Sequence, residues 1–365
     1  MTPPEALRPQ HRISPTSRLA LLMDGHLRDR SGKMGFGLLR YSSAPVVCVI
    51  AATDAGGDLR AITGIDTDVP IVADVAEAAA LGADVLVIAV ATSGGVLPPG
   101  FRSEMLRGLS SGMSLVNGLH GVYADEPDLA AALQPGSFIW DVRQEPPGLG
   151  SGRARALELA CRRVLTVGTD MAVGKMTASI ELDRAASARG LRSRFLATGQ
   201  IGMCISGGGI ALDAVRVDFA SAAVEAMCIE HGSDHDVLWI EGQGSALHPG
   251  STAWVALLRG SVPTDLVLVH RPGQTALEDL EHIAIPPLPE VIALYEAVAA
   301  AAPAYPRAKV GAIALNCSRL TDEEADRAVE EIEELTGIPT VDVMRHGTDR
   351  VLDALLGAPR GSRGR

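Results

Sequence analysis

The sequence predicts an α/β protein of two domains, each built on a mainly parallel β-sheet. Near-continuous apolar runs of strand length alternate with helical stretches, which is typical of parallel strands covered by helices on both faces. The alternation stops at a segment rich in proline and glycine, residues 145–154, and then restarts. A length of 365 residues also favours two domains over one.

The N-terminal elements indicate a Rossmann-like domain over residues 17–147, preceded by a flexible leader over residues 1–16. No G-x-G-x-x-G pattern follows the first apolar run, so the sequence does not favour NAD as a ligand. Strands are expected at residues 18–24, 44–52, 84–90, 115–119 and 138–143, and helices at residues 72–83 and 126–136.

The remaining residues, 148–365, indicate a P-loop α/β domain of the NTPase-like kind. A helix at 175–190 follows a glycine-rich loop. In a second helix, at 321–337, Thr321 and Glu324 form a capping-box pattern and Gly337 marks the end. Strands are expected at residues 164–168, 192–199, 236–242, 265–271 and 309–316.

Composition and charge argue against several classes of function. The formal net charge of −12 disfavours nucleic-acid binding, which depends on clustered Lys and Arg. No apolar run reaches the roughly 20 residues of a membrane span, and no apolar signal sequence is present, so a cytoplasmic protein is expected. Five cysteines without a C-x-x-C pair are expected to be buried thiols. No resident metal site is predicted, and a homo-oligomer is the default expectation.

The segment GTDMAVGK, residues 168–175, is expected to bind phosphate. A glycine-rich turn between a strand and a helix directs backbone N–H groups at an anion, and Lys175 adds a positive charge. Its glycines are one residue further apart than in the usual G-x-x-x-x-G-K-[ST] pattern. The predicted cofactor-binding residues here are Gly168, Thr169, Asp170, Val173, Gly174, Lys175, Met176 and Thr177.

Met176 occupies the position at which an ATP-binding loop carries a hydroxyl for magnesium. A thioether is a poor ligand for Mg²⁺, which prefers hard oxygen ligands. Thr177 lies one position further along and points about 100° away around the helix. A diphosphate that is never cleaved needs no such metal. Coenzyme A carries one, together with an adenine and a reactive thioester.

The loop resembles the GTD-x-x-V-G-K loop of dethiobiotin synthetase and the related cobyrinic-acid amide synthases. Further landmarks agree in chain order: Thr198 and Gly199, then Glu241, then Asn316. The resemblance implies that Thr198 and Gly199 lie near substrate. It also implies that Glu241 stands where those enzymes carry a metal-binding Glu, and that Asn316 reads the adenine edge.

Over almost its whole length, the chain resembles the DgcN-type D-glutamate N-acetyltransferases, a family first catalogued as a domain of unknown function. The resemblance implies a Rossmann-like domain joined to a P-loop domain, and acetyl transfer from acetyl-CoA to the amine of D-glutamate. The first residues of GKMGFGLLRY depart from the family pattern. The resemblance rests on GLLRY (37–41), the segment at 94–98, NGLHGVYADEP (117–127), WDVRQEPP (140–147), VGTDMAVGKMT (167–177), residues 197–219, WIEGQGSALHPG (239–250) and HGTDRVLDAL (346–355).

Several residues at predicted strand ends are candidates for chemistry in the C-terminal domain. Glu241 is the expected general base, which removes a proton from the substrate ammonium, and Lys175 is the second catalytic candidate. The alternative role for Glu241 is structural, as a hydrogen-bonding partner that orders the loop. Gln243 and Gln200 are expected to contact substrate.

Two further groups of residues complete the predicted substrate site. Ser206 and Gly207 begin a glycine run that is expected to form either an anion-binding nest or a mobile lid. His120, Arg143 and Arg40 are the N-terminal candidates, since an acidic amino acid requires a cationic partner for each carboxylate. The alternative for these three is an ordinary surface or interdomain ion pair.

The sequence leaves three functions open. The leading one is an acyl-CoA-dependent N-acyltransferase that acts on the amine of an amino acid, with acetyl-CoA as co-substrate and D-glutamate or a similar amino acid as acceptor. The main alternative is an ATP- and Mg²⁺-dependent ligase or kinase-like enzyme of the dethiobiotin synthetase type, in which Thr177 and Glu241 share the magnesium. The third is a non-catalytic sensor of a nucleotide or of CoA.

Overall fold

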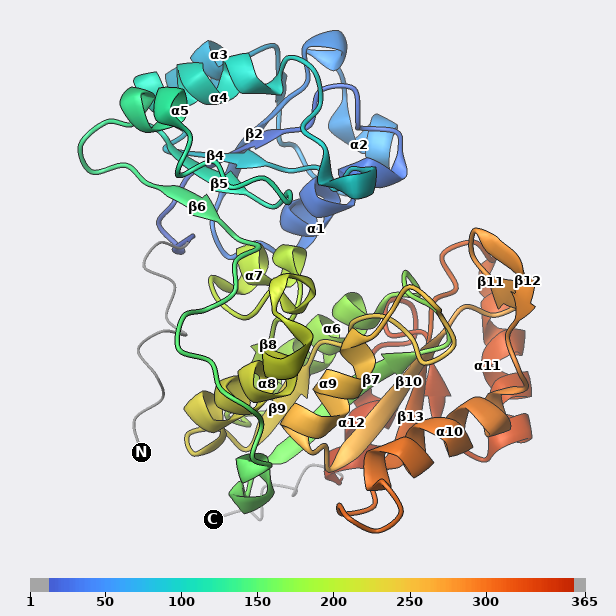
Figure 1. Ribbon diagram of the computed structural model, residues 1–365. Coiled ribbons are helices and arrows are strands. Elements are labelled where there is room, and N and C mark those ends of the chain that lie inside the picture. Colours follow the sequence, from blue (N-terminus) through green and yellow to red (C-terminus); the bar gives the residue numbers. More distant parts are fainter. Residues whose placement is uncertain (1–12, 358–365) are drawn as a thin grey trace, which may run out of the picture. The chain divides into compact units, whose positions relative to one another are not determined.

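The computed structural model describes residues 13–357, which cluster into two compact units (Figure 1). The N-terminal unit contains residues 13–145 and 199–214, and the C-terminal unit contains residues 146–198 and 215–357. The second domain was expected to run unbroken from residue 148, whereas residues 199–214 cluster with the first unit. Most of the expected leader, residues 1–16, lies outside the described residues.

The N-terminal unit is built on a six-stranded sheet with the order β3-β2-β1-β4-β5-β6, in which all neighbouring strands run parallel. This order confirms the Rossmann-like prediction. The strands are β1 (Leu19–Leu22), β2 (Val46–Ile50), β3 (Ile71–Val72), β4 (Val85–Ile88), β5 (Ser114–Asn117) and β6 (Ile139–Asp141).

Helices α3, α4 and α5 cover one face of this sheet. Successive strand residues point to opposite faces, so Ala20 and Leu22 of β1 share one apolar core with Met105 and Leu109 of α4. The helices of this unit are α1 (Lys33–Tyr41), α2 (Leu59–Thr63), α3 (Val75–Ala80), α4 (Phe101–Ser110), α5 (Pro127–Ala132) and α7 (Gln200–Ser206).

The C-terminal unit repeats this plan with a six-stranded parallel sheet in the order β14-β13-β10-β7-β9-β8. A small antiparallel hairpin, β11 (Ala276–Leu277) and β12 (Leu280–Ala284), follows β10. The strands of the main sheet are β7 (Arg162–Gly168), β8 (Ser193–Leu196), β9 (Val237–Ile240), β10 (Asp265–His270), β13 (Lys309–Leu315) and β14 (Thr340–Val341).

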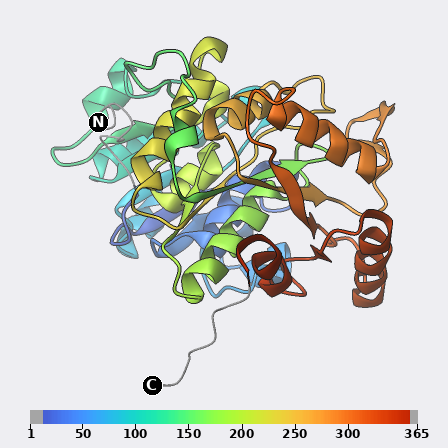
Figure 2. The same ribbon diagram turned by 90° about the horizontal axis from the view of Figure 1, so that it is seen from below.

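Helices lie on both sides of this second sheet (Figures 1 and 2). Leu182 of α6 and Leu352 of α12 share a core with Val164, Trp239 and Val267 of the strands. The other helices α8, α9 and α10 pack against β9, β7 and β13. The helices are α6 (Lys175–Ala188), α8 (Val217–Gly232), α9 (Ala253–Ser261), α10 (Leu288–Ala300), α11 (Asp322–Thr336) and α12 (Asp349–Leu356).

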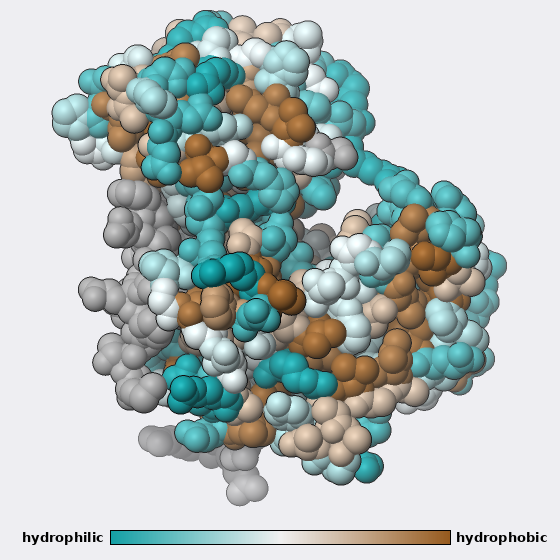
Figure 3. All heavy atoms as spheres, viewed as in Figure 1, coloured by the Kyte–Doolittle hydropathy of each residue, from teal (hydrophilic) through white to brown (hydrophobic). Residues whose placement is uncertain are grey.

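The surface is mixed in character. On the face drawn in Figure 3, hydrophobic residues are interspersed with hydrophilic ones. None of the described helices combines the length and the hydropathy that a bilayer span requires. All five cysteines are buried as free thiols, as expected.

Helix α11 begins at the predicted capping box. The Thr321 hydroxyl accepts the N–H of Glu324, and the Glu324 carboxylate accepts the N–H of Thr321. Thr321→Ala should therefore lower the free energy of unfolding by about 1 kcal/mol, measured by urea denaturation. Thr321→Ser keeps the hydroxyl and should lose much less. An equal loss in both variants would contradict the capping role.

Candidate functional site

The predicted phosphate loop joins β7 to α6, at the C-terminal edge of the sheet. Two positions in the loop require glycine, one because of a close approach and the other because of its backbone conformation. A Cβ on Gly168 would lie 2.9 Å from the Val173 side chain and 3.1 Å from Lys175 Nζ. Gly174 has φ of 111°, a value that side chains disfavour. The strand, loop and helix therefore fold as the sequence predicts.

Lys175 is buried beneath this loop, with 4% of its surface exposed. Its ammonium donates hydrogen bonds to the backbone oxygens of Asp170 and Met171, both at 2.7 Å. Burial lowers the pKa of Lys175 to about 7, although the charges of Asp170 and Glu241 act in the opposite direction. An anion in the loop would favour the charged ammonium and would compete with these carbonyls for it.

Met176 and Thr177 lie half-buried in the first turn of α6. The hydroxyls deeper in this region serve the fold, because Thr166 Oγ1 lies 3.0 Å from Ser179 Oγ and accepts the N–H of Gly242 at 2.9 Å. These bonds join β7 to α6 and to the turn after β9. Thr166 and Ser179 are therefore engaged in structural hydrogen bonds, and we do not assign either of them the role of the hydroxyl that Met176 lacks.

Asp170 ties the loop to the segment that follows β10. Its Oδ2 accepts the side-chain amide of Gln274 and the N–H of Glu278, both at 2.7 Å, and its Oδ1 accepts the N–H of Met171. The carboxylate is 3% exposed. A structural role for Asp170 accounts for all of these bonds, and its expected role in cofactor binding stays a prediction.

Two further side chains fix the start of the loop. The Thr169 hydroxyl lies 2.9 Å from His270 Nδ1, and burial together with the charge of Arg271 lowers the pKa of His270 to about 4, so the ring is neutral. The Tyr295 hydroxyl donates to Gly168 O at 2.8 Å and accepts the N–H of Ala246 at 2.9 Å. Sequence reasoning missed Tyr295, whose only signal is a polar hydroxyl in an otherwise apolar helix face.

Asn316 follows β13 and contacts the same loop. Its side-chain amide donates to Val173 O at 3.0 Å, and its oxygen accepts the N–H of Ser318 at 3.3 Å. The residue is half-buried. It orders the loop in this structure, and its expected role at an adenine edge stays a prediction.

Glu241 follows β9 and is 4% exposed. Its carboxylate accepts the N–H of Thr198 at 2.8 Å and the side-chain amide of Gln243 at 3.3 Å, while the Thr198 hydroxyl donates to Glu241 O at 2.7 Å. The structure thus brings Glu241, Gln243 and the end of β8 together, in the same unit as the phosphate loop.

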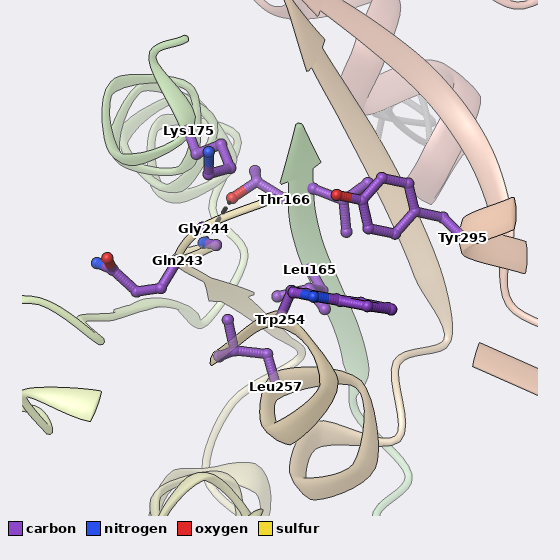
Figure 4. Close-up of a pocket in the computed structure, with 10 residues that line it drawn as sticks. Leu165, Thr166, Lys175, Gln243, Gly244, Trp254, Leu257 and Tyr295 are labelled. Carbon is purple, nitrogen blue, oxygen red and sulfur yellow. Dashed lines mark hydrogen bonds between the residues drawn. The ribbon is translucent and has the colours of Figure 1, made fainter. Parts of the chain in front are cut away.

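A small pocket of about 10 Å³ lies between the Lys175 side chain and the turn after β9 (Figure 4). Trp254 and Tyr295 line it and meet edge to face, with ring centroids 6.0 Å apart. Gln243 belongs to the same lining. A space of this size accommodates about one water molecule, so it is not a binding site for a whole substrate.

Three predicted substrate residues gather in the N-terminal unit, at the C-terminal ends of its strands. Arg143 Nη1 lies 2.5 Å from His120 Nε2 and 2.9 Å from Asp213 Oδ2. Gln200 begins α7, and its Cγ would lie 3.5 Å from a Cβ placed on Gly118. Ligands of open α/β sheets bind at this edge.

The other predicted residues lie apart from these groups. Arg40 is exposed in the last turn of α1. Gly207 ends α7, and its N–H donates to Met203 O at 2.9 Å, while the Ser206 hydroxyl donates to Gly208 O. Because the cap uses this amide and a helix C-terminus repels anions, the geometry does not favour the anion-binding nest.

Comparison with known proteins agrees with this architecture. Residues 148–352 match the DUF1611 P-loop domain and residues 52–145 match the DUF1611 Rossmann-like N-terminal domain, both described as domains of unknown function. The chain belongs to the DUF1611 family. A crystal structure of a DUF1611 family protein from Anabaena variabilis ATCC 29413 has a TM-score of 0.90 and 53% sequence identity, over 93% of this chain and 99% of that one.

Two curated relatives carry a functional name. The chain is similar to the D-glutamate N-acetyltransferase of Tritonibacter scottomollicae, with 39% identity over 281 residues. It is also similar to the D-glutamate N-acetyltransferase of a Pseudoalteromonas species, with 34% identity over 281 residues. Each match covers 76% of this chain and 83% of the relative.

We predict that one methyl group added to Gly242, in the turn after β9, strongly destabilises the protein. A Cβ on Gly242 would lie 1.9 Å from Thr166 O, so Gly242→Ala must displace β7 or the turn. We expect it to lower the free energy of unfolding by about 3 kcal/mol. Gly150 has open space around its Cα, and Gly150→Ala should change stability by less than about 0.5 kcal/mol. Equal unfolding midpoints in urea for the two variants would refute the close approach.

Proposed function

We propose that the protein transfers the acetyl group of acetyl-CoA to the amine of D-glutamate. The observation that carries this proposal is a phosphate loop with a buried Lys175 followed by Met176, where a metal-dependent loop carries a hydroxyl. Such a loop suits a diphosphate that is bound and not cleaved. The names of the two curated relatives support acetyl transfer and the choice of D-glutamate as the amine.

The loop amides and the Lys175 ammonium hold the diphosphate of coenzyme A in this proposal. Lys175 already points at loop carbonyls 2.7 Å away, so it is positioned before a ligand arrives. The helix dipole of α6 adds to the attraction. Asn316 orders the loop through its hydrogen bond to Val173 O. We assign the adenine of coenzyme A to a position beside Asn316.

The chemistry is a direct acyl transfer. The amine nitrogen attacks the thioester carbonyl, a C–N bond forms and the C–S bond breaks. The leaving thiolate takes up the second proton that the nitrogen loses, and coenzyme A departs as the thiol. One proton of the substrate ammonium must pass to a base before attack, and we assign this role to Glu241. Orientation of the two bound reactants supplies much of the rate.

A second candidate is the ATP- and Mg²⁺-dependent activation of a carboxylate. The observation that favours it is the position of Glu241 at the end of β9, beside the phosphate loop whose Lys175 it influences electrostatically. Thr177 and Glu241 would then bind the metal. This candidate predicts ADP formation that depends on a carboxylic acid.

The deciding assay measures free thiol released from acetyl-CoA, with D-glutamate or L-glutamate as acceptor and with EDTA present. We expect thiol release with D-glutamate that EDTA does not inhibit. No acetylation of either amine, or strict dependence on ATP and Mg²⁺, would contradict the proposal.

Lys175→Met should lower kcat/KM by on the order of 100-fold, because a buried donor to the bound anion is lost. Lys309→Met is the matched control. Lys309 is the first residue of β13, at the end of the strand opposite to Asn316, and it pairs with Glu296. The substitution should therefore leave kcat/KM unchanged. Full activity of the Lys175→Met enzyme would show that Lys175 does not contribute to the active site.

The depressed pKa of Lys175 also predicts how binding depends on pH. The free lysine titrates at about 7, and a bound diphosphate raises its pKa, so binding takes up a proton above that pH. The affinity for acetyl-CoA, measured by calorimetry, should therefore fall from about pH 7 to about pH 9, by up to tenfold per pH unit. Lys175→Arg keeps its charge and should bind with a flat profile. Constant wild-type affinity over this range would contradict the assignment.

A further inference from the structure

A tight turn follows β10, at the same edge of the sheet as the phosphate loop. Residues 271–274 read Arg-Pro-Gly-Gln, the pattern of a type II β-turn with proline second and glycine third. Gly273 has φ of 77°, and the N–H of Gln274 donates to Arg271 O at 3.1 Å. The Gln274 side chain in turn donates to Asp170 of the loop at 2.7 Å. The backbone of Arg271 is therefore held in place next to the loop.

The side chain of Arg271 contacts the loop directly. Its Nη2 donates to Ala172 O at 3.1 Å, one residue before the Val173 O that accepts from Asn316. The N–H of Asn316 also donates to His270 O at 2.8 Å, so Arg271 and Asn316 start from neighbouring backbone positions. Arg271 thus lies beside both the loop and the position that we assign to the adenine of coenzyme A.

Arg271 has a buried donor without an acceptor. Its Nε is fully buried and has no hydrogen-bond partner among residues 13–357, and the side chain as a whole is 12% exposed. Its Nη1 lies 3.4 Å from Glu278 Oε2, which is longer than a normal charge-assisted hydrogen bond. Buried guanidinium donors are almost always paired in native proteins, so Arg271 is incompletely paired within the described part of the chain.

Glu278 is shared between two arginines. Its Oε1 accepts from Arg319 Nη2 at 3.0 Å, which is the shorter of its two contacts with guanidinium groups. Arg319 lies three residues after Asn316, and its side chain is 61% exposed. Arg271 can therefore exchange Glu278 for another anion while Arg319 keeps that carboxylate paired.

We propose that Arg271 binds the ribose 3′-phosphate of coenzyme A. The choice of coenzyme rests on the proposed function, and the choice of residue rests on the contacts above. The 3′-phosphate is attached to the ribose that joins the adenine to the diphosphate. With the diphosphate in the loop and the adenine beside Asn316, the ribose lies next to Arg271. The planar fork of a guanidinium matches two oxygens of a phosphate.

This contact selects coenzyme A against nucleotides that lack the 3′-phosphate. ATP, ADP and 3′-dephospho-CoA carry a hydroxyl at that position, so none of them offers Arg271 an anion in place of Glu278. A site built to pair a ligand group discriminates strongly against ligands without that group, because its own polar atoms are then left unpaired. Arg271 is therefore a specificity-determining residue in this proposal.

Calorimetry on the full chain in EDTA, with CoA and 3′-dephospho-CoA as titrants, tests the contact without requiring catalysis. We expect the wild type to bind CoA at least about tenfold more tightly than 3′-dephospho-CoA. Arg271→Met should lose about tenfold in affinity for CoA and little for 3′-dephospho-CoA. Arg271→Lys keeps the charge and should recover part of the loss.

Arg192→Met is the matched control. Arg192 precedes β8 and pairs at 2.6 Å with Asp236, which precedes β9, so this ion pair lies at the edge of the sheet opposite to the loop. Its affinities for both titrants should equal those of the wild type. An equal effect of Arg192→Met and Arg271→Met on CoA binding would show general loss of positive charge and would contradict the assignment.

Glu278→Gln gives a second test, in which affinity rises. The substitution removes the carboxylate that competes for Arg271 and keeps the backbone N–H that donates to Asp170. We expect the affinity for CoA to increase by about twofold to fivefold, and the increase to disappear in the Arg271→Met background. An increase that persists in that background, or that is equal for 3′-dephospho-CoA, counts against the exchange of partners.

Three outcomes of the first test overturn the inference. They are no binding of CoA to the wild type, equal wild-type affinity for the two titrants, or equal loss for both titrants in Arg271→Met, which would mean that Arg271 only anchors the loop. The result is separable from the proposed function. An Arg271-dependent preference for CoA without thiol release removes the acetyl transfer and keeps this contact. Thiol release by Arg271→Met at the wild-type KM for acetyl-CoA removes this contact and keeps the acetyl transfer.

Discussion

The buried ammonium of Lys175 is the interaction on which the C-terminal site depends. A charge in that position is expensive unless it is hydrogen-bonded, and here the oxygens of Asp170 and Met171 supply two bonds of 2.7 Å. The same burial brings its pKa to about 7, so the lysine is held at the balance between charged and neutral forms. A bound diphosphate gives the Lys175 ammonium a negatively charged partner in place of the neutral carbonyl groups. Anion binding and protonation of Lys175 are therefore coupled.

The rest of the C-terminal site holds the loop in the shape that this lysine requires. Asp170 anchors the loop to the segment after β10, Tyr295 anchors Gly168 from α10, and Asn316 anchors Val173 from the end of β13. A diphosphate bound without a metal receives its charge compensation from the loop alone. A loop fixed from three sides before the ligand arrives loses little entropy on binding, and it offers its donors in place.

Local sequence patterns were sufficient for five of the six strands of each sheet and for the phosphate loop, but not for the two-residue edge strands β3 and β14. Apolar runs such as 84–90 and 265–271 mark buried parallel strands, and the glycine and lysine at 174–175 mark a strand-to-helix junction. Tyr295 could not be found in this way, because its role comes from a hydrogen bond to Gly168, more than 100 positions away. The return of residues 199–214 to the N-terminal unit also leaves no local pattern.

The central claim is that the Lys175 loop binds an intact diphosphate without a metal. Calorimetric titration of the wild-type protein with acetyl-CoA in EDTA, and separately with ATP in excess Mg²⁺, tests it most directly. The account predicts that acetyl-CoA binds in EDTA, that Lys175→Met abolishes this binding, and that MgATP at the same concentration gives no saturable heat. Saturable binding of MgATP that EDTA reverses, with no binding of acetyl-CoA, would contradict it.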